Sequence, residues 1–303
     1  MRSSLGRMFL VSGTKRSGTS MWMQVLRSAG VPVLGSAFPR NWGESSLKDA
    51  NPDGFYESIL RQGIYFRTNP HPTTGAYFMP DDVAGYSVKV FIPGVVRTER
   101  AYIDLVVANV REWREYEASI NRLYALEQAD REKKNPGAEA PLHFPPAYEW
   151  WMENFALMRD ISLRGYAYQL QTYDEVLAEP QRVIPEVLGR MEVPDANIEA
   201  AVAAVKPDNR TQDRAAGALT SDSVPGELAE TFDELYTVVR ERRPVAGAFL
   251  KRLNDTNRAL LPKLTALQSD VVQAMAKQQQ RAGGKAKPMG IEGLPQNPAN
   301  PKR

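Results

Sequence analysis

The stretch that decides the fold reads Phe9-Leu10-Val11-Ser12-Gly13-Thr14-Lys15-Arg16-Ser17-Gly18-Thr19-Ser20. It begins with an apolar run, continues into a short loop bounded by two glycines, and leads into a helix-like pattern of apolar residues from Met21. A strand, a glycine loop and a helix in this order aim backbone N–H groups and the positive end of a helix at one point. We therefore expect this loop to bind an anion.

The loop is close to the nucleotide-binding consensus G-x-x-x-x-G-K-[ST]. Its two glycines have the consensus spacing and Ser20 closes the motif, but Thr19 stands where the consensus has lysine. The positive charges come earlier, at Lys15 and Arg16. The loop therefore predicts a site for a phosphate-like group that differs from the usual site for ATP and Mg²⁺.

The composition of the chain excludes several classes of chemistry. Among its 303 residues there is no cysteine and there are only two histidines, so disulfides, thiol nucleophiles and multi-histidine metal sites are excluded. A net charge of +2 gives no general attraction to nucleic acid or membranes. No signal peptide precedes the first apolar run, and no apolar run reaches the roughly 18 residues of a membrane span. We expect a cytoplasmic protein without a bound metal.

Strand patterns alternate with helix patterns along the first two thirds of the chain. This alternation predicts an α/β fold, with a central parallel sheet flanked by helices on both faces. Ligands of such sheets bind beyond the carboxyl ends of the strands, where the glycine loop lies. Strands are predicted at 8–12, 86–92, 102–110 and 165–172, and helices at 18–29, 53–67, 112–131, 147–161, 180–191 and 197–205.

Three segments follow from these patterns. Residues 1–222 form the predicted α/β domain, with a hydrophilic loop at 132–146 that we expect to lie over the site. Residues 223–275 are helical, with an apolar stripe that packs either on this domain or on a partner chain, as in a homodimer. Residues 276–303 are rich in Lys, Gln, Gly, Pro and Asn, a composition typical of disorder.

A second candidate element for phosphate binding is Arg111, which follows the predicted strand 102–110. An arginine at a strand end can hold a phosphate with two parallel hydrogen bonds. Ser119 comes eight residues later on the next predicted helix and can add a further bond. Alone, this pair is equally compatible with a surface ion pair and an exposed serine, so its meaning depends on the glycine loop.

Taken together, these elements resemble the PAPS-dependent sulfotransferase family, in its bacterial type (PAPS is 3′-phosphoadenosine 5′-phosphosulfate). Two more stretches agree: 172–180 resembles the family's Tyr-Glu-Asp-Leu-x-x-Asp-Pro element, and 51–57 resembles an Asn-Pro-x-Gly-aromatic-aromatic-Glu stretch. The resemblance covers about residues 8–190. It implies a P-loop-like sulfotransferase fold that moves a sulfuryl group from PAPS to a hydroxyl or amine and releases PAP, without a metal.

The resemblance also implies roles for individual residues. The glycine loop would hold the 5′-phosphosulfate, Arg111 and Ser119 would hold the 3′-phosphate, and Tyr173 would lie near the adenine. Arg210 and Arg214 stand where the cytosolic branch holds the 3′-phosphate a second time, but its Arg-Lys-Gly signature is missing. The loop residues concerned are Lys15, Arg16, Ser17, Gly18, Thr19 and Ser20.

The proton acceptor of the reaction is less defined. The cytosolic branch has a catalytic histidine two residues after a strand-end lysine, whereas here Lys89 is followed by Phe91. We favour Glu57, since the tyrosylprotein branch also uses a glutamate there; the alternative is a carboxylate that stabilises a helix N-terminus. His71 is the second candidate. Arg16 would stabilise the leaving phosphate, and Lys89 would assist the sulfonate.

Two other functions stay open at this point. A P-loop kinase or nucleotide hydrolase is disfavoured by Thr19 and by the lack of an acidic Mg²⁺-holding strand end, because Arg111 stands at that place. A non-catalytic nucleotide-binding protein is suggested by Phe91 and by the long C-terminal helical segment. The acceptor cannot be read from the loops, so it is expected only to be a small molecule, a lipid or a glycan, and no nucleic-acid partner is expected.

Overall fold

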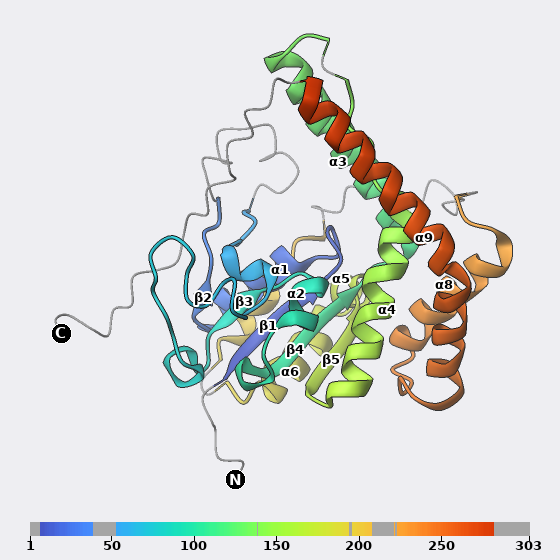
Figure 1. The fold of residues 1–303 in the computed structure, drawn as a ribbon. Helices are drawn as coiled ribbons and strands as arrows, with labels where there is room; N and C mark the ends of the chain where they lie inside the picture. Colours follow the sequence, from blue (N-terminus) through green and yellow to red (C-terminus); the bar gives the residue numbers. More distant parts are fainter. Residues whose placement is uncertain are drawn as a thin grey trace.

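The computed structural model describes residues 7–38, 53–137, 139–193, 196–207, 221 and 223–281 of the chain. Within this described part, five parallel strands form one sheet in the order β2-β3-β1-β4-β5. The predicted fold class, a central parallel sheet flanked by helices, is confirmed (Figure 1). The strands are β1 Met8–Gly13, β2 Val33–Leu34, β3 Ser87–Lys89, β4 Ile103–Val110 and β5 Ala167–Thr172.

Helices connect these strands and extend beyond the last of them. The α-helices are α1 Thr19–Ser28, α2 Ile92–Arg97, α3 Trp113–Lys134, α4 Pro146–Arg164, α5 Tyr173–Ala178, α6 Pro180–Arg190, α7 Ile198–Ala203, α8 Gly226–Arg240 and α9 Gly247–Arg281. Three 3₁₀ turns complete the set: η3 Ile59–Gln62, η4 Pro80–Val83 and η5 Arg100–Tyr102. None of the helices in the described part is long and apolar enough to cross a membrane.

The two faces of the sheet are buried because side chains alternate along each strand. In β1, Phe9 and Val11 point into an apolar cluster with α1, α6 and α7. Met8 and Leu10 point to the opposite face, into a cluster with α2 and α4. β4 continues both clusters, so β1 and β4 are covered on both sides, as the near-continuous apolar runs of interior parallel strands require.

A third apolar cluster joins the C-terminal helices to the rest of the chain. Phe232 of α8 stacks on Trp151 of α4 with ring centroids 5.0 Å apart, and it meets the edge of Trp113 of α3 at 5.7 Å. Leu260 and Leu264 of α9 are buried in the same cluster. α9 packs against α4 and α8, and Figure 1 shows α3 and α9 extending away from the sheet.

The helix predicted over 53–67 is wrong. Glu57 instead forms an antiparallel bridge with Ser36, and only η3 is helical in this stretch. Gly54 and Tyr56 have positive φ angles of 101° and 54°, which are incompatible with a right-handed helix. The apolar spacing that suggested a helix therefore belongs to a short extended stretch around Glu57, to η3 and to the turns that follow it.

The predicted strand 86–92 is shorter than expected, because β3 ends at Lys89 and α2 begins at Ile92. Pro93 lies in the first turn of α2, where a missing N–H costs nothing. At the other end of the chain, α9 continues past residue 275 to Arg281. The rest of the tail predicted to be disordered lies outside the described residues.

Candidate functional site

The loop between β1 and α1 is shaped by backbone conformations with positive φ. Gly13 and Gly18 have φ angles of 149° and 89°, and Arg16 also lies in the left-handed region, at 64°. A Cβ at Gly13 would stand 2.3 Å from Ser17 Oγ and 2.6 Å from the carbonyl oxygen of Asn109. The first glycine of the motif is therefore required by crowding against β4 as well as by its backbone conformation.

α1 begins directly after this loop, at Thr19. No side chain caps its N-terminus, no acidic residue lies in its first turn, and its N-cap is Gly18. The first N–H groups of a helix have no partner within the helix and carry the positive end of its dipole. The end of the loop, from Gly18 to Ser20, thus presents donors suited to an anion.

Asn109, near the end of β4, holds the glycine loop in place through hydrogen bonds. Its side chain donates to the carbonyl oxygen of Ser17 at 3.1 Å and accepts from Trp22 Nε1 and Gln171 Nε2, both at 2.7 Å. This residue therefore ties the loop, α1 and β5 together, and Trp22 is a core residue with its N–H satisfied. This role of Asn109 could not be predicted from the sequence, because a single asparagine in an apolar strand is a common pattern.

Arg111 lies just beyond β4 and is buried, with 3% of its surface exposed. Its Nη1 donates to the carbonyl oxygen of Arg16 at 2.9 Å, its Nε faces Glu115 at 3.4 Å, and its guanidinium lies 4.9 Å from the ring of Tyr173. Within the described residues, its Nη2 is buried without an acceptor. Because a buried charged donor without a partner is costly, this nitrogen marks a place for an anionic ligand.

Arg16 lies close to Arg111, so two guanidinium groups share one side of the loop. Arg16 Nε donates to Ser119 Oγ at 3.2 Å, across from the loop to α3. Burial, and then the charge of Arg111, lower the pKa of the Arg16 guanidinium. Arg16, Arg111 and Ser119, which were predicted from separate parts of the sequence, are thus brought together, and an anion between the two cations would relieve their repulsion.

Lys89, at the end of β3, lies on the other side of the loop. Its Nζ donates to Ser20 Oγ at 3.2 Å, to the carbonyl oxygen of Phe55 at 3.0 Å and to Glu57 Oε1 at 3.2 Å. Only 4% of Lys89 is exposed. Burial lowers the pKa of its ammonium group, and the charge of Glu57 opposes that shift only in part.

Glu57 is held on both of its carboxylate oxygens. Lys89 contacts Oε1, and Arg61, one turn later in η3, contacts Oε2. The backbone of Glu57 is fixed as well, through the bridge to Ser36. The extended stretch therefore brings Glu57 to Lys89, which in turn contacts Ser20 at the start of α1.

His71 is buried in a turn of its own. Its Nδ1 accepts from the backbone N–H groups of Thr73 and Thr74, at 3.2 and 3.1 Å. No contact recorded among the described residues joins it to Glu57 or Arg16, so the structure does not bring this second candidate base to the loop.

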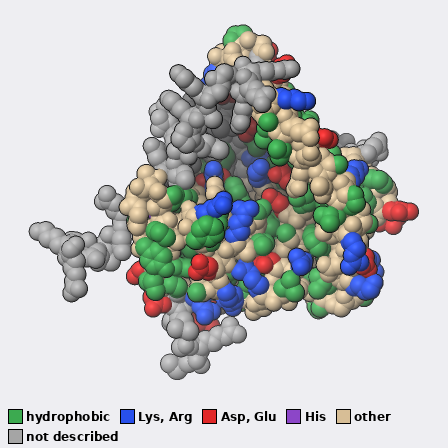
Figure 2. All heavy atoms as spheres, in the orientation of Figure 1, with side chains coloured by type: hydrophobic (Ala, Val, Ile, Leu, Met, Phe, Trp, Pro, Cys, Tyr) green, Lys and Arg blue, Asp and Glu red, His purple; other side chains and the backbone are tan. Residues whose placement is uncertain are grey.

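Two carboxylates that sequence reasoning missed lie beside Lys15. Its Nζ contacts Glu149 Oε1 at 3.3 Å, and Tyr116 donates its hydroxyl to Glu149 Oε2 at 2.9 Å. Glu153 follows one turn later on α4, and burial together with the charge of Glu149 raises its pKa to about 8. Spacing of four in a predicted helix could have placed both on one face. Figure 2 shows acidic and basic side chains meeting in a hollow on one face of the molecule.

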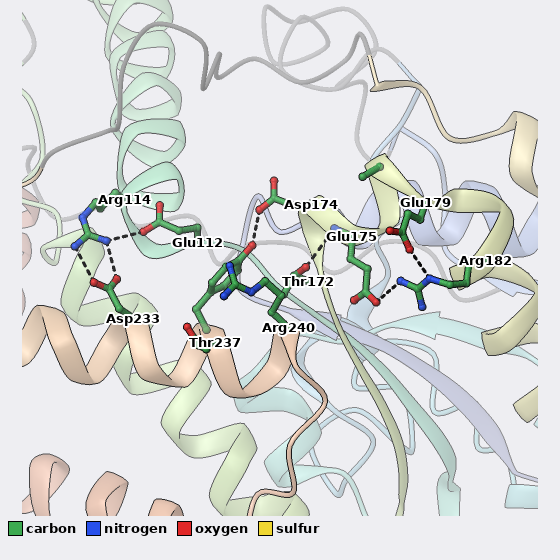
Figure 3. Close-up of a pocket in the computed structure, with 12 residues that line it drawn as sticks. Glu112, Arg114, Thr172, Asp174, Glu175, Glu179, Arg182, Asp233, Thr237 and Arg240 are labelled. Carbon is green, nitrogen blue, oxygen red and sulfur yellow. Dashed lines mark hydrogen bonds and ion pairs between the residues drawn. The ribbon is translucent and has the colours of Figure 1, made fainter.

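A separate charged pocket of 580 Å³ lies among the start of α3, α5 and α8 (Figure 3). Its walls are joined by ion pairs: Arg114 contacts Asp233 at 2.7 Å, and Arg182 contacts Glu175 at 2.6 Å. Thr172 and Asp174, the neighbours of Tyr173, line this pocket. The pocket therefore lies next to the segment that carries Tyr173. Its ion pairs tie α8 to α3 and α6 to α5, and the hydroxyl of Tyr236 in α8 donates to Asp174 of α5.

Some predicted elements cannot be placed. Arg210, Arg214 and the first two residues of the 51–57 stretch lie outside the described residues. Among the residues that the structure does describe, no group of three or more histidine, aspartate and glutamate side chains could hold a metal ion.

Comparisons with known proteins give a solved structure of low similarity. No protein-family model matches this chain, and no curated protein matches it. Among solved structures, it is similar to the crystal structure of a sulfotransferase from Mycobacterium tuberculosis H37Rv. The two chains share 13% sequence identity over 76% of each, with a TM-score of 0.43.

Proposed function

We propose that this protein is a sulfotransferase that moves the sulfuryl group of PAPS to a hydroxyl or amine of an acceptor and releases PAP. The observation that carries the proposal is Arg111, whose buried Nη2 lacks an acceptor where its Nη1 braces the backbone of Arg16. A donor with separate 5′- and 3′-phosphate groups needs two anion sites side by side. The glycine loop would supply one, and Arg111 with Ser119 would supply the other.

The residues present fit such a donor. The uncapped start of α1 and the left-handed loop suit the 5′-phosphosulfate, because backbone N–H groups and the helix dipole both favour an anion there. Arg111, with Ser119 beside Arg16, would hold the 3′-phosphate. Tyr173 lies against Arg111 and would face the adenine.

PAPS supplies an activated sulfuryl group, and the chain's own residues would do the rest. Arg16 and the N–H groups from Gly18 to Ser20 would stabilise the charge that grows on the leaving phosphate as its bond to sulfur breaks. Lys89 would hold the sulfonate oxygens. Glu57 would take the proton that the acceptor oxygen or nitrogen loses as it bonds to sulfur.

A second candidate is a non-catalytic protein that binds a 3′-phosphorylated nucleotide. It is favoured by the contacts of Lys89 and Arg61 with Glu57, which occupy both oxygens of the carboxylate that a catalytic base would need to be free. For both candidates we propose the cytoplasm as the place of action. For both we also propose that no nucleic acid is a partner, since the net charge is only +2. For the enzyme, the acceptor is a small molecule, a lipid or a glycan.

Turnover separates the two candidates. The protein is incubated with PAPS and pooled small hydroxyl and amine compounds in the presence of a chelator, and PAP is measured. The proposal predicts PAP formation that depends on the pool and is unaffected by the chelator. Binding of PAP without any transfer supports the non-catalytic candidate, whereas cleavage of ATP that requires Mg²⁺ supports a kinase or hydrolase.

A further inference from the structure

Helix α8 is joined to both of the helices that begin beside the proposed donor site. It contacts the first turn of α3, which follows Arg111, and the first turn of α5, which begins at Tyr173. The guanidinium of Arg111 and the ring of Tyr173 lie 4.9 Å apart. A helix from the C-terminal part of the chain therefore reaches the immediate neighbours of both residues.

Asp233 of α8 makes the contact with α3. One carboxylate oxygen accepts from Trp113 Nε1 at 2.8 Å and from Arg114 Nη1 at 2.7 Å, and the other accepts from Arg114 Nη2 at 3.1 Å. Trp113 is fully buried, so its indole N–H needs such an acceptor. A carboxylate that holds a guanidinium through two parallel bonds also fixes its orientation. Asp233 therefore sets the position of the first two residues of α3.

Tyr236, about one turn later on α8, makes the contact with α5. Its hydroxyl donates to the carboxylate of Asp174, the residue after Tyr173. The ring of Tyr236 is buried in the same apolar cluster as Phe232 and Leu235. Because the ring is held in the core, its hydroxyl is a fixed point from which the start of α5 is positioned.

The space between the two helix starts is the charged pocket of 580 Å³ (Figure 3). Glu112 and Arg114 line one side of it, Thr172 and Asp174 line another, and Asp233 and Tyr236 of α8 complete the wall. On the side of the sheet, β4 and β5 remain paired up to Val110 and Thr172. The helix starts are thus held by the paired strands at their base and bridged by α8 across the pocket.

The position of Arg111 matters because its Nη1 is already bonded to the carbonyl oxygen of Arg16, which leaves its Nη2 for a ligand. We propose that Asp233 and Tyr236 are positioning residues of the donor site. Asp233 holds Arg111 in place for the 3′-phosphate through the start of α3. Tyr236 holds Tyr173 in place for the adenine through Asp174. The identity of the ligand rests on the proposed function, whereas the positioning of the two helix starts can be tested without it.

The test uses calorimetric titration of variants with PAP and with 5′-AMP. Asp233→Asn keeps an oxygen for Trp113 but sets an NH₂ group against the guanidinium of Arg114. Its PAP affinity should fall by about five-fold or more, the usual scale for contacts that act on a site from a distance. Its 5′-AMP affinity should stay nearly unchanged, because 5′-AMP lacks the phosphate that Arg111 would bind. Tyr236→Phe removes only a hydroxyl and should weaken both nucleotides by similar factors, because both carry the adenine.

Two further variants separate positioning from a general loss of stability. Glu234→Gln changes the next residue of α8 and removes an ion pair with Arg252 of α9, so it is the matched control and should change neither affinity. Asp233→Glu keeps the carboxylate and should retain more PAP affinity than Asp233→Asn. Equal loss of PAP affinity in Glu234→Gln and Asp233→Asn, or equal loss for both nucleotides in Asp233→Asn, overturns the inference.

A second readout separates this inference from the proposed function. If the wild type binds neither nucleotide, the proposed function fails, and amide hydrogen exchange of the free protein decides the positioning role. Exchange should be faster than in Glu234→Gln over residues 111–117 of Asp233→Asn and over residues 173–178 of Tyr236→Phe, because local opening exposes the amides. Exchange equal to that of Glu234→Gln in both segments overturns the inference.

Discussion

The guanidinium of Arg111 supports the loop through Arg16, since its Nη1 donates to the carbonyl oxygen of Arg16 at 2.9 Å. Arg16 is one of the few residues other than glycine with a positive φ, and its side chain turns towards Ser119. Arg111 thus fixes the backbone of Arg16, while the Nη2 of Arg111 stays available for a ligand. This relationship is the structural basis of the proposed donor site.

The first prediction concerns recognition of the 3′-phosphate. Arg111→Ala should weaken binding of PAP by about 1.5–3 kcal/mol, the usual cost of a lost hydrogen bond to a charged group. Binding of 5′-AMP, which lacks the 3′-phosphate, should weaken much less. Calorimetric titration of both nucleotides measures the difference, and equal weakening would exclude the 3′-phosphate role of Arg111.

The second prediction separates crowding from backbone strain at the two ends of α1. Gly18 and Gly30 have similar φ angles of 89° and 92°, but a Cβ would stand 2.6 Å from the Tyr173 ring at Gly18 and would meet nothing within 4 Å at Gly30. Gly30→Ala should cost about 1–2 kcal/mol of stability, because a residue with a Cβ is strained at positive φ, and should leave PAP affinity unchanged. Gly18→Ala should displace Tyr173 and weaken PAP binding as well.

Urea unfolding and PAP titration of both alanine variants measure these effects. Similar PAP affinities in the two variants would mean that the contact between Gly18 and Tyr173 does not shape the donor site.

The third prediction tests Glu57 as the proton acceptor. Glu57→Gln should abolish PAP formation from PAPS and leave PAP affinity nearly intact. Arg61→Gln, which removes a cation from the same carboxylate, is the matched control and should retain turnover. Full activity of Glu57→Gln would exclude Glu57 as the base.

The fourth prediction is a dependence of stability on pH that comes from Glu153. Burial, and then the charge of Glu149, raise the pKa of Glu153 to about 8 in the folded protein from an ordinary value of 4.5, so the folded state binds more protons between these values. The stabilisation from Glu153 is therefore complete below pH 4.5 and is lost as the pH rises through about 8. Glu153→Gln cannot ionise, so its stability relative to the wild type should rise from pH 5 to pH 9.

The urea concentrations at the midpoint of unfolding, measured for the wild type and for Glu153→Gln at both pH values, report this change in stability. A constant difference between them would show that Glu153 titrates normally in the folded protein.

The sequence was a good guide where a local pattern and a fixed conformation coincide. The loop from Gly13 to Ser20 could be recognised because its glycines meet a steric demand and its cations lie in the same short stretch. Arg111 and Ser119 could be paired because a strand and the next helix fix their spacing. Predicting these positions required only the order of strand, loop and helix along the chain.

The rest depends on packing between distant segments. Glu57 reaches Lys89 through an extended segment that bridges to Ser36, which the apolar spacing of residues 53–67 could not indicate. The contact between Lys15 and Glu149 joins residues 134 positions apart. Nothing in the sequence around Lys15 or around Glu149 indicates such a pairing, so the carboxylates beside the loop could be identified only from the structure.

The most direct test of the proposed donor site is calorimetric titration of the wild-type protein with PAP, 5′-AMP and ATP, each with and without Mg²⁺. The account predicts that PAP binds tightly and independently of Mg²⁺, and that 5′-AMP binds more weakly because Arg111 then lacks its phosphate partner. A preference for ATP that requires Mg²⁺, or equal binding of PAP and 5′-AMP, would contradict it.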